Sequence, residues 1–264
     1  YETKQVFCES RDGTRVPMFI TQSKDLAFDS NNPTLLYGYG GFNVSEMPHF
    51  SPHILLWLEN GGVYAVANVR GGGEYGQKWH EAGMLMNKQN AFNDFNAAAQ
   101  WLISNKYTRP ERLAIRGKSN GGLLVAACML QQPDLFGAVV CQAPVLDMLR
   151  HNTMTSYGGW KLEYGNAWTS SAMFRALYAY SPLHNVQRRT AYPPILVTTA
   201  DHDDLVAPAH AMKFVATLQN RAARKYPVLL RVETKGGHRA KALLKWIAEE
   251  TDIYLFLFRT LQVR

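Results

Sequence analysis

The sequence predicts an α/β fold in which helices cover both faces of a mostly parallel central sheet that begins with an antiparallel hairpin. Short apolar runs alternate with segments of helical periodicity along most of the 264 residues, as is typical of βα units that place strands in parallel. The first two runs differ because residues 11–14 (R-D-G-T) join them, and so short a turn joins antiparallel strands. We expect a ligand site at the carboxyl ends of the parallel strands.

Each predicted element follows from its pattern of apolar residues. The predicted strands are the apolar or alternating runs at residues 4–8, 15–20, 34–39, 63–69, 113–115, 138–141, 195–199 and 228–232. The predicted helices are residues 90–105, 123–130, 208–220 and 241–260, where apolar side chains recur at helical spacing. Residues 154–180 are rich in Gly, Ser and aromatics and predict an irregular excursion over the site. No repeat, low-complexity tract or linker divides the chain, so we expect one domain over residues 1–264.

The basic charge of the chain does not by itself indicate a nucleic-acid-binding protein. The formal net charge is +7, but the Lys and Arg residues are scattered along the sequence. Only Arg221, Arg224 and Lys225 gather, near the end of a predicted helix, which is typical of a solvated surface. We therefore expect no nucleic-acid partner.

Membrane, secretion and disulfide signals are also missing from the sequence. No apolar run approaches the length of about 18 residues that a membrane span needs, and the first residues lack the layout of a signal peptide. We expect a soluble cytoplasmic protein with no membrane partner. Cys8, Cys128 and Cys141 are odd in number and have no C-x-x-C spacing, so they predict neither a disulfide framework nor a zinc site.

Residues 117–122 (G-K-S-N-G-G) carry the strongest chemical signal in the chain. They lie between a predicted strand and a predicted helix, so Ser119 is expected at the apex of a tight turn with its hydroxyl exposed. Glycines two residues before and after the serine allow the crowded backbone of such a turn. The pattern predicts a nucleophile elbow, and the backbone N–H of Asn120, at the start of the helix, is placed to stabilise an oxyanion.

A serine nucleophile needs a base, and the base needs an acid to orient it. The best candidate base is His238, because it follows a late predicted strand on a glycine-containing loop. Three aspartates follow the preceding strand, at 201, 203 and 204. We favour Asp203, because Asp201 comes first out of the strand and Asp204 is placed to cap the next helix. Spacing alone leaves the choice among the three open.

Two other motifs suggest different chemistry. Residues 71–76 (G-G-G-E-Y-G) fit G-x-G-x-x-G, but no helix is predicted directly after the glycines and no acidic residue follows the next strand, as a dinucleotide site requires. We expect instead a glycine-supported loop near the site. Residues 201–204 (D-H-D-D) have no second cluster at metal-ligand spacing. We predict no metal and no cofactor.

Six segments together resemble the catalytic domain of the prolyl oligopeptidase family, serine peptidases of the α/β-hydrolase fold, and the likeness extends over essentially the whole chain. The segments are residues 37–43 (Y-G-Y-G-G-F-N), 70–76 (R-G-G-G-E-Y-G), 119–124 (S-N-G-G-L-L), 180–186 (Y-S-P-L-H-N-V), 199–204 (T-A-D-H-D-D) and 237–238 (G-H).

The resemblance implies a role for each matching residue. Ser119 corresponds to the nucleophile, Asp203 to the acid and His238 to the base. Tyr39 matches a tyrosine that joins the Asn120 N–H in the oxyanion hole. The resemblance also implies a proline pocket, in which a flat indole stacks on the pyrrolidine ring. The pocket residues are Phe42, Trp160, Tyr164 and Val206.

The chain departs from the family pattern at positions beside the site. Lys118 stands where the family usually has glycine, and Leu205 replaces an arginine that usually anchors a substrate carbonyl. Arg239 and Lys241 follow His238 where small residues are usual, and their positive charge is expected to lower the pKa of the imidazole. These changes put the elbow geometry, the peptide affinity and the histidine loop in question.

The sequence and the resemblance together predict a serine endopeptidase that hydrolyses short peptides after proline through an acyl-enzyme. A peptide macrocyclase or transpeptidase on the same scaffold is one alternative, and a catalytically weakened binding module is another. A carboxylesterase is disfavoured by the pocket aromatics. The expected partners are short proline-containing peptides and the family's β-propeller domain. Neither that propeller nor the family's N-terminal hydrolase segment matches any part of this sequence, so we expect the chain to be one part of a larger polypeptide.

Overall fold

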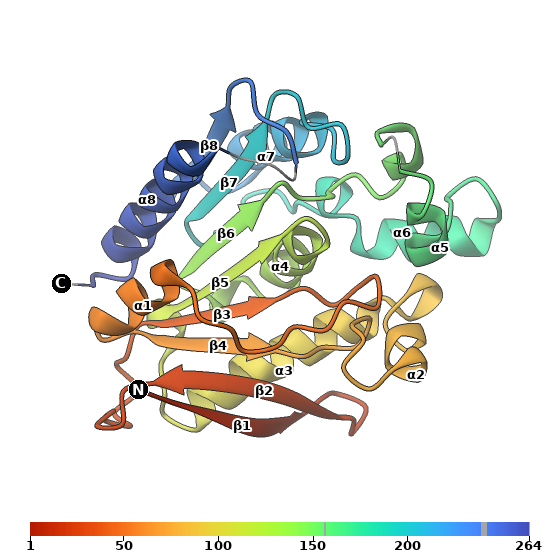
Figure 1. The fold of residues 1–264 in the computed structure, drawn as a ribbon. Helices are drawn as coiled ribbons and strands as arrows, with labels where there is room; N and C mark the ends of the chain where they lie inside the picture. Colours follow the sequence, from red (N-terminus) through yellow and green to blue (C-terminus); the bar gives the residue numbers. More distant parts are fainter. Residues whose placement is uncertain (156, 239–241, 264) are drawn as a thin grey trace.

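One mixed sheet of eight strands runs through the computed structural model, which describes residues 1–155, 157–238 and 242–263. The strand order is β1-β2-β4-β3-β5-β6-β7-β8 (Figure 1). The strands are β1 (Glu2–Glu9), β2 (Arg15–Gln22), β3 (Thr34–Gly38), β4 (Val63–Ala67), β5 (Leu113–Lys118), β6 (Ala138–Gln142), β7 (Ile195–Ala200) and β8 (Val228–Glu233). Every predicted strand is present, with ends that differ by a few residues.

The pairing of the strands confirms a mostly parallel sheet with an antiparallel beginning. Strand β1 pairs with β2 and β2 with β4 in antiparallel register, whereas β4, β3, β5, β6, β7 and β8 follow one another in parallel. The first hairpin turns at Gly13, whose φ of 82° lies in the left-handed region that favours glycine. The six parallel strands therefore end at one common edge of the sheet.

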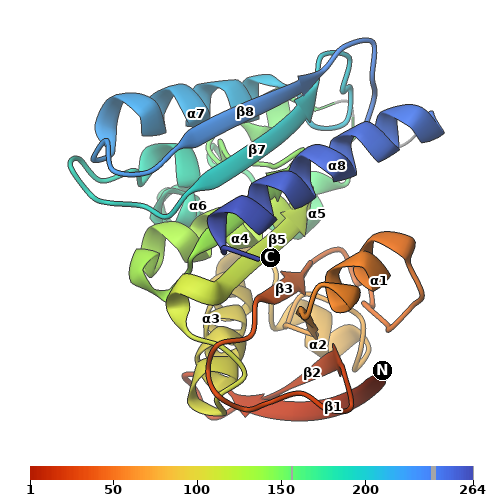
Figure 2. The same ribbon diagram turned by 90° about the vertical axis from the view of Figure 1, so that its left-hand side faces the viewer.

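Helices cover both faces of this sheet, as predicted (Figure 2). The helices are α1 (Pro52–Glu59), α2 (Gln77–Glu81), α3 (Gln89–Ser104), α4 (Asn120–Gln131), α5 (Trp160–Tyr164), α6 (Ser171–Tyr180), α7 (Ala209–Arg221) and α8 (Leu243–Thr260). The larger core packs α3, α4 and α7 against one face, and a smaller core packs α1 and α8 against the other. The predicted start of the last helix, at residue 241, lies outside the described residues. None of the helices in the described ranges is long and apolar enough to cross a membrane.

Four helices were not predicted from the sequence. Helix α2 occupies part of the segment expected to be a loop after the glycines, and α5 and α6 lie in the segment expected to be irregular. Helices α2 and α5 have five residues each, too few to display an amphipathic repeat. Helix α1 is apolar around most of its circumference, so it has no polar face to reveal it, although Pro at its first turn is a common start signal.

Candidate active site

Ser119 lies at the turn between β5 and α4, at the carboxyl edge of the sheet, and its backbone is strained. Its φ of 59° and ψ of −115° fall where non-glycine residues are rare. A Cβ on Gly117 would collide with the carbonyl of Gly121, and one on Gly121 would come within 2.5 Å of the Gly38 carbonyl oxygen. Glycine is therefore needed on both sides of the serine for β5, α4 and β3 to meet this closely.

The candidate base and acid meet on the loops that follow β8 and β7. The Nδ1–H of His238 donates a hydrogen bond of 2.7 Å to Oδ2 of Asp203. The other carboxylate oxygen of Asp203 accepts the backbone N–H groups of Leu205 at 3.1 Å and Val206 at 2.8 Å. Both side chains are buried. These contacts hold the Asp203 carboxylate in place and leave Nε2 of His238 available to exchange a proton.

Asp201 has a different place from Asp203. Its Oδ1 pairs with Nδ1 of His202 at 2.6 Å and accepts the N–H of Gly236 at 3.3 Å, so it joins the acid loop to the histidine loop. The predicted capping role of Asp204 is wrong, because α7 begins after Pro208 and has no side-chain cap.

No hydrogen bond between the Ser119 hydroxyl and His238 occurs within the described part of the chain. The two residues nevertheless follow parallel strands of the same sheet, β5 and β8, at its carboxyl edge. This contact is often long in unliganded serine hydrolases and tightens when substrate binds.

The candidate oxyanion-hole residues come together through the side chain of Asn120. This residue is the first of α4, so its backbone N–H has no acceptor within the helix and lies at the positive end of the helix dipole. Its Nδ2 donates to the backbone carbonyl of Tyr39, the residue that follows β3, and its Oδ1 accepts the Tyr164 hydroxyl at 2.8 Å. The sequence indicated a role only for the backbone of Asn120, yet its side chain joins residues 39–44, which we call the oxyanion loop, to the aromatic residues.

The aromatic residues expected to line a proline pocket form one cluster. The rings of Phe42 and Tyr164 meet edge to face with centroids 5.6 Å apart, and those of Trp160 and Tyr164 do so at 6.1 Å. Val206 lies on the acid loop, where its N–H binds Asp203. Trp160, Tyr164 and Val206 are buried, whereas Phe42 is half-buried.

Two buried histidines that sequence analysis did not single out lie against this cluster. The His151 ring is 5.4 Å from that of Tyr164 and 6.1 Å from that of Trp160, and the His210 ring is 6.3 Å from that of Trp160. Burial lowers the pKa of His151 and of His210 to about 4. Within the described ranges, neither nitrogen of His151 has a hydrogen-bond partner. Both imidazoles are therefore neutral at physiological pH.

A cluster of three charged or ionisable side chains was also missed. Glu163, on α5, pairs with Lys88 at 2.9 Å and with His80 at 2.8 Å. Glu163 is 75 residues from Lys88 and 83 from His80 in the sequence, and the three belong to no motif, so no local signal could have found them.

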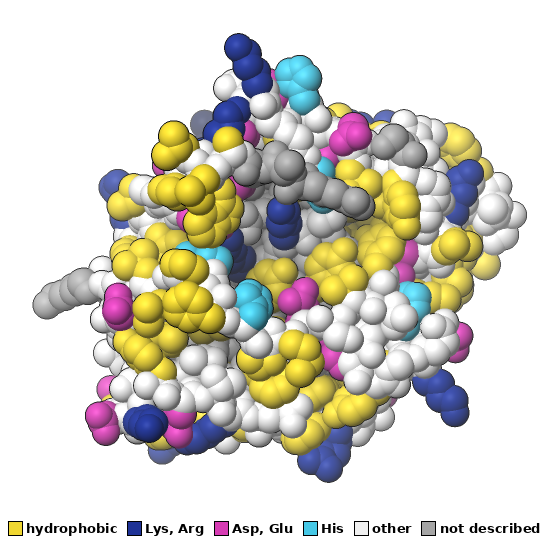
Figure 3. All heavy atoms as spheres, in the orientation of Figure 1, with side chains coloured by type: hydrophobic (Ala, Val, Ile, Leu, Met, Phe, Trp, Pro, Cys, Tyr) yellow, Lys and Arg dark blue, Asp and Glu magenta, His cyan; other side chains and the backbone are white. Residues whose placement is uncertain are grey.

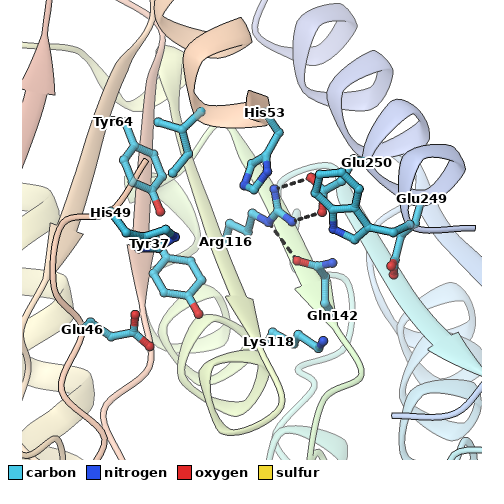
Figure 4. Close-up of a pocket in the computed structure, with 12 residues that line it drawn as sticks. Tyr37, Glu46, His49, His53, Tyr64, Arg116, Lys118, Gln142, Glu249 and Glu250 are labelled. Carbon is cyan, nitrogen blue, oxygen red and sulfur yellow. Dashed lines mark hydrogen bonds and ion pairs between the residues drawn. The ribbon is translucent and has the colours of Figure 1, made fainter. Parts of the chain in front are cut away.

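The residues that depart from the family pattern have distinct places. Lys118 is the last residue of β5, and its side chain lines a hollow between α1 and α8 on the opposite face of the sheet from α4 (Figure 4). The strand, turn and helix of the elbow form with lysine at this position. Leu205 is partly buried against the larger core. Arg239 and Lys241, with their expected effect on the His238 pKa, lie outside the described residues.

The glycine-rich residues 71–76 pack against the oxyanion loop. The Gly71 carbonyl accepts the N–H of Asn43 at 3.2 Å, and the N–H of Gly73 donates to the Val44 carbonyl at 3.2 Å. Contrary to expectation, a helix does begin directly after Gly76, but it ends after five residues. Within the described ranges, no group of three or more His, Cys, Asp or Glu residues is arranged to hold a metal ion.

Comparison with known proteins assigns this chain to one family. A model of the Prolyl oligopeptidase family matches residues 48–264. The prolyl endopeptidase of Elizabethkingia meningoseptica is 51% identical over 257 residues, which cover 97% of this chain and 36% of that protein.

Solved structures agree with the sequence match. A prolyl endopeptidase studied for the role of inter-domain dynamics in catalysis and specificity has a TM-score of 0.97 at 53% identity, covering 100% of this chain and 39% of the other. Prolyl oligopeptidase B from Galerina marginata, bound to a 35mer hydrolysis and macrocyclization substrate, has a TM-score of 0.95 at 40% identity, with coverage of 100% and 38%.

This chain spans little more than a third of the length of these relatives. The match over the whole of the chain confirms the predicted α/β-hydrolase fold and the predicted resemblance. The chain belongs to the prolyl oligopeptidase family.

Proposed function

We propose that this chain is the catalytic domain of a serine peptidase that hydrolyses short peptides on the carboxyl side of proline. The observation that carries the proposal is that the strained Ser119 elbow and the buried His238–Asp203 pair both follow strands at the carboxyl edge of the same sheet. The aromatic cluster beside them suits a proline ring. Membership of the family supports the same activity.

The proposed reaction proceeds through an acyl-enzyme. Ser119 Oγ attacks the carbonyl carbon after proline while Nε2 of His238 takes the hydroxyl proton. Asp203 stays ionised and stabilises the imidazolium through Nδ1–H. The tetrahedral oxyanion accepts hydrogen bonds from the Asn120 N–H and the Tyr39 hydroxyl, each worth about 3 kcal/mol of transition-state stabilisation.

His238 then gives its proton to the leaving amine, and the C–N bond breaks. In the second half of the reaction, His238 takes a proton from water, which attacks the acyl-enzyme. Collapse of the second tetrahedral intermediate releases the new carboxyl group and returns the proton to Ser119. No cofactor is required for either half.

Hydrolysis of a fluorogenic peptide ending in Gly-Pro by the full-length protein tests this proposal. Ser119→Ala should abolish the activity, and Asp203→Asn should lower kcat by about 10⁴-fold because the histidine loses its orienting carboxylate. Asp201→Asn is the matched control and should cost less than about tenfold, since Asp201 contacts loop residues rather than His238. Hydrolysis that survives Ser119→Ala would refute the mechanism.

Transpeptidation is the second candidate, and it differs only in whether water or a peptide amine resolves the acyl-enzyme. The Galerina marginata relative was solved with a substrate for both hydrolysis and macrocyclization. Mass spectrometry of the products from a long proline-containing peptide separates the two outcomes, because a cyclic product is lighter than the linear acid by one water.

Fluorophosphonate labelling of Ser119 addresses the remaining alternative, a binding module without activity. A competent elbow with its base and oxyanion hole reacts with the probe, whereas a catalytically dead site does not. Labelling that is absent in the wild-type protein would favour the binding module over either enzyme.

We further propose that a second domain of the complete protein, a β-propeller in the family pattern, associates with this chain. The coverage of little more than a third of each relative leaves room for such a domain. Apolar side chains gather on the face of the molecule that contains the hollow (Figure 3). Next to the starts of α1 and α8, the side chains of Met47, Phe50, Leu243 and Leu244 are exposed at 59, 79, 68 and 79%. Exposed apolar residues in this number are typical of a surface that another protein segment covers.

A further inference from the structure

Three side chains from separate segments meet beside Phe42 and Tyr164 of the aromatic cluster. Glu163 comes from α5, Lys88 immediately precedes α3, and His80 comes from α2. The side chains of Lys88 and Glu163 are 1% and 2% exposed, and that of His80 is 15% exposed. We call these three residues the Glu163 cluster.

The Glu163 cluster holds the backbone of the oxyanion loop at two points. Oε2 of Glu163 accepts the N–H of Phe42 at 3.0 Å, and Nζ of Lys88 donates to the carbonyl of Gly40 at 2.9 Å. Gly40 and Phe42 have φ values of 63° and 56°, and the second is costly for a residue with a side chain. These two contacts therefore stabilise a strained loop that begins at Tyr39.

The same cluster holds the aromatic residues. Helix α5 carries Trp160 and Tyr164 on either side of Glu163, and with five residues it has little stability of its own. The Lys88 ammonium also lies 5.3 Å from the centre of the Tyr164 ring. Because Glu163 belongs to α5 and binds Phe42 across 121 residues of sequence, it ties the pocket to the loop directly.

The charges within the cluster depend on one another. Burial alone would raise the pKa of Glu163, but the Lys88 charge and hydrogen bonds from His80, Lys88 and Phe42 hold it below its ordinary value. Burial lowers the pKa of Lys88, and Glu163 opposes that effect. Removing one partner therefore leaves the other charge buried and uncompensated.

We propose that the Glu163 cluster is a positioning device that couples proline binding to oxyanion stabilisation. The cluster fixes helix α5 and the oxyanion loop relative to each other, so a proline ring seated against Trp160 and Phe42 presents its carbonyl to Tyr39 and Asn120. These are positioning residues, because they act through the pocket and the loop. The inference rests on the proposed function.

The test compares Glu163→Gln with Glu250→Gln in the full-length protein. Glu250 is also buried and ion-paired, to Arg116, but lies on the opposite face of the sheet. Active sites are counted with a fluorophosphonate probe, and kcat/KM is measured for matched substrates with proline or alanine before the scissile bond. We expect Glu163→Gln to lower the proline-to-alanine ratio at least tenfold per active site, because misplaced binding groups cost such factors. Glu250→Gln should change the ratio less than twofold.

A double-mutant cycle with Tyr39→Phe tests the link to the oxyanion hole. In the wild-type protein the loss of the Tyr39 hydroxyl should reduce kcat by about 10²-fold or more. In the Glu163→Gln background the same change should cost at least tenfold less, because the loop no longer holds the hydroxyl in place. Independent effects would contradict the coupling.

A second variant separates an effect on activity from an effect on stability. If Glu163→Gln fails to fold, His80→Gln replaces it, since that change leaves the Glu163–Lys88 pair intact, and we expect about a threefold fall in the proline-to-alanine ratio with the melting temperature unchanged. If the wild-type protein hydrolyses the proline substrate and a folded variant keeps the wild-type proline-to-alanine ratio, the positioning role of the cluster is overturned and the proposed function is not. Absence of wild-type hydrolysis overturns the proposed function and the inference with it.

Discussion

Two buried ion-pair clusters lie on opposite faces of the sheet, and they differ in what they hold together. The Glu163 cluster joins the five-residue helix α5 to the oxyanion loop. On the other face, Arg116 of β5 binds Glu250 of α8 through two hydrogen bonds and Gln142 of β6 through a third (Figure 4). Both clusters are buried and charged.

Whether a buried ion pair affects function depends on what else positions the segments that it joins. The Arg116 cluster links two neighbouring parallel strands and a helix of 18 residues, all of which are also positioned by backbone ladders and apolar packing. Helix α5 and the oxyanion loop lie outside the eight strands of the described sheet, so the ladders between those strands do not position them. We therefore expect the Arg116 cluster to affect stability and the Glu163 cluster to affect stability and catalysis.

The largest expected effect comes from removing one partner of each cluster. Lys88→Met and Arg116→Met should each lower the free energy of unfolding by about 3–5 kcal/mol, because each leaves a carboxylate buried without its counter-charge. Denaturant titration of the full-length protein measures this loss. Only Lys88→Met should also lower kcat/KM per active site for a proline substrate, by tenfold or more.

The paired variants serve as controls for this prediction. Arg116→Met combined with Glu250→Leu removes both charges and should return stability to within about 2 kcal/mol of the wild-type protein. Lys88→Met combined with Glu163→Gln should regain stability without regaining proline hydrolysis. Equal losses of activity in Lys88→Met and Arg116→Met would show that the Glu163 cluster has no role in catalysis beyond its effect on stability.

Lowering the pH should decrease the free energy of unfolding through His151 and His210, which lie against the aromatic cluster. A fall in pKa from 6.5 to about 4 corresponds to about 3 kcal/mol per imidazole. Between pH 6.5 and 4 the unfolded chain binds protons that the native protein does not. Stability due to these groups is therefore complete above pH 6.5 and falls steadily as the pH is lowered to 4.

Urea unfolding at a series of pH values measures this dependence. His151→Phe should reduce the slope of unfolding free energy against pH in that window by about 1.4 kcal/mol per pH unit, the contribution of one proton. On the other face, burial also lowers the pKa of His53, so His53→Phe is the matched variant and should reduce the slope less. If the slope of unfolding free energy against pH is unchanged in His151→Phe, burial of the neutral His151 imidazole is not the cause of the pH dependence.

The smallest effect is expected at Lys118, which adjoins the nucleophile but lines the hollow beside the Arg116 cluster. Lys118→Gly should change kcat/KM less than about threefold and lower stability by about 1 kcal/mol, the usual cost of glycine within a strand. Lys118→Met keeps the aliphatic stem and is the control. A loss of activity above tenfold in either variant would mean that the side chain in the hollow affects catalysis on the other face of the sheet.

Most of the fold was predictable from local patterns. Strands, long helices and the first hairpin have periodicities or turn residues that act over a few positions, so every strand and the helices α3, α4, α7 and α8 were found. The short helices α2 and α5 were not, because five residues carry no repeat. The elbow was recognisable because a Cβ on Gly117 would collide with the carbonyl of Gly121, a steric requirement between residues close together in the sequence.

The sequence by itself determined the order of the elements, the serine at a strained turn and the candidates for its partners. Only the tertiary structure decided which aspartate hydrogen-bonds His238, since spacing left three open and the packing of two loops brings Asp203 to it. The Glu163 cluster likewise depends on contacts across 48 to 121 residues. A charge that is buried on folding loses its hydration and must be paired with an opposite charge. The partner comes from whichever segment packs beside it, so no local sequence pattern predicts the pair.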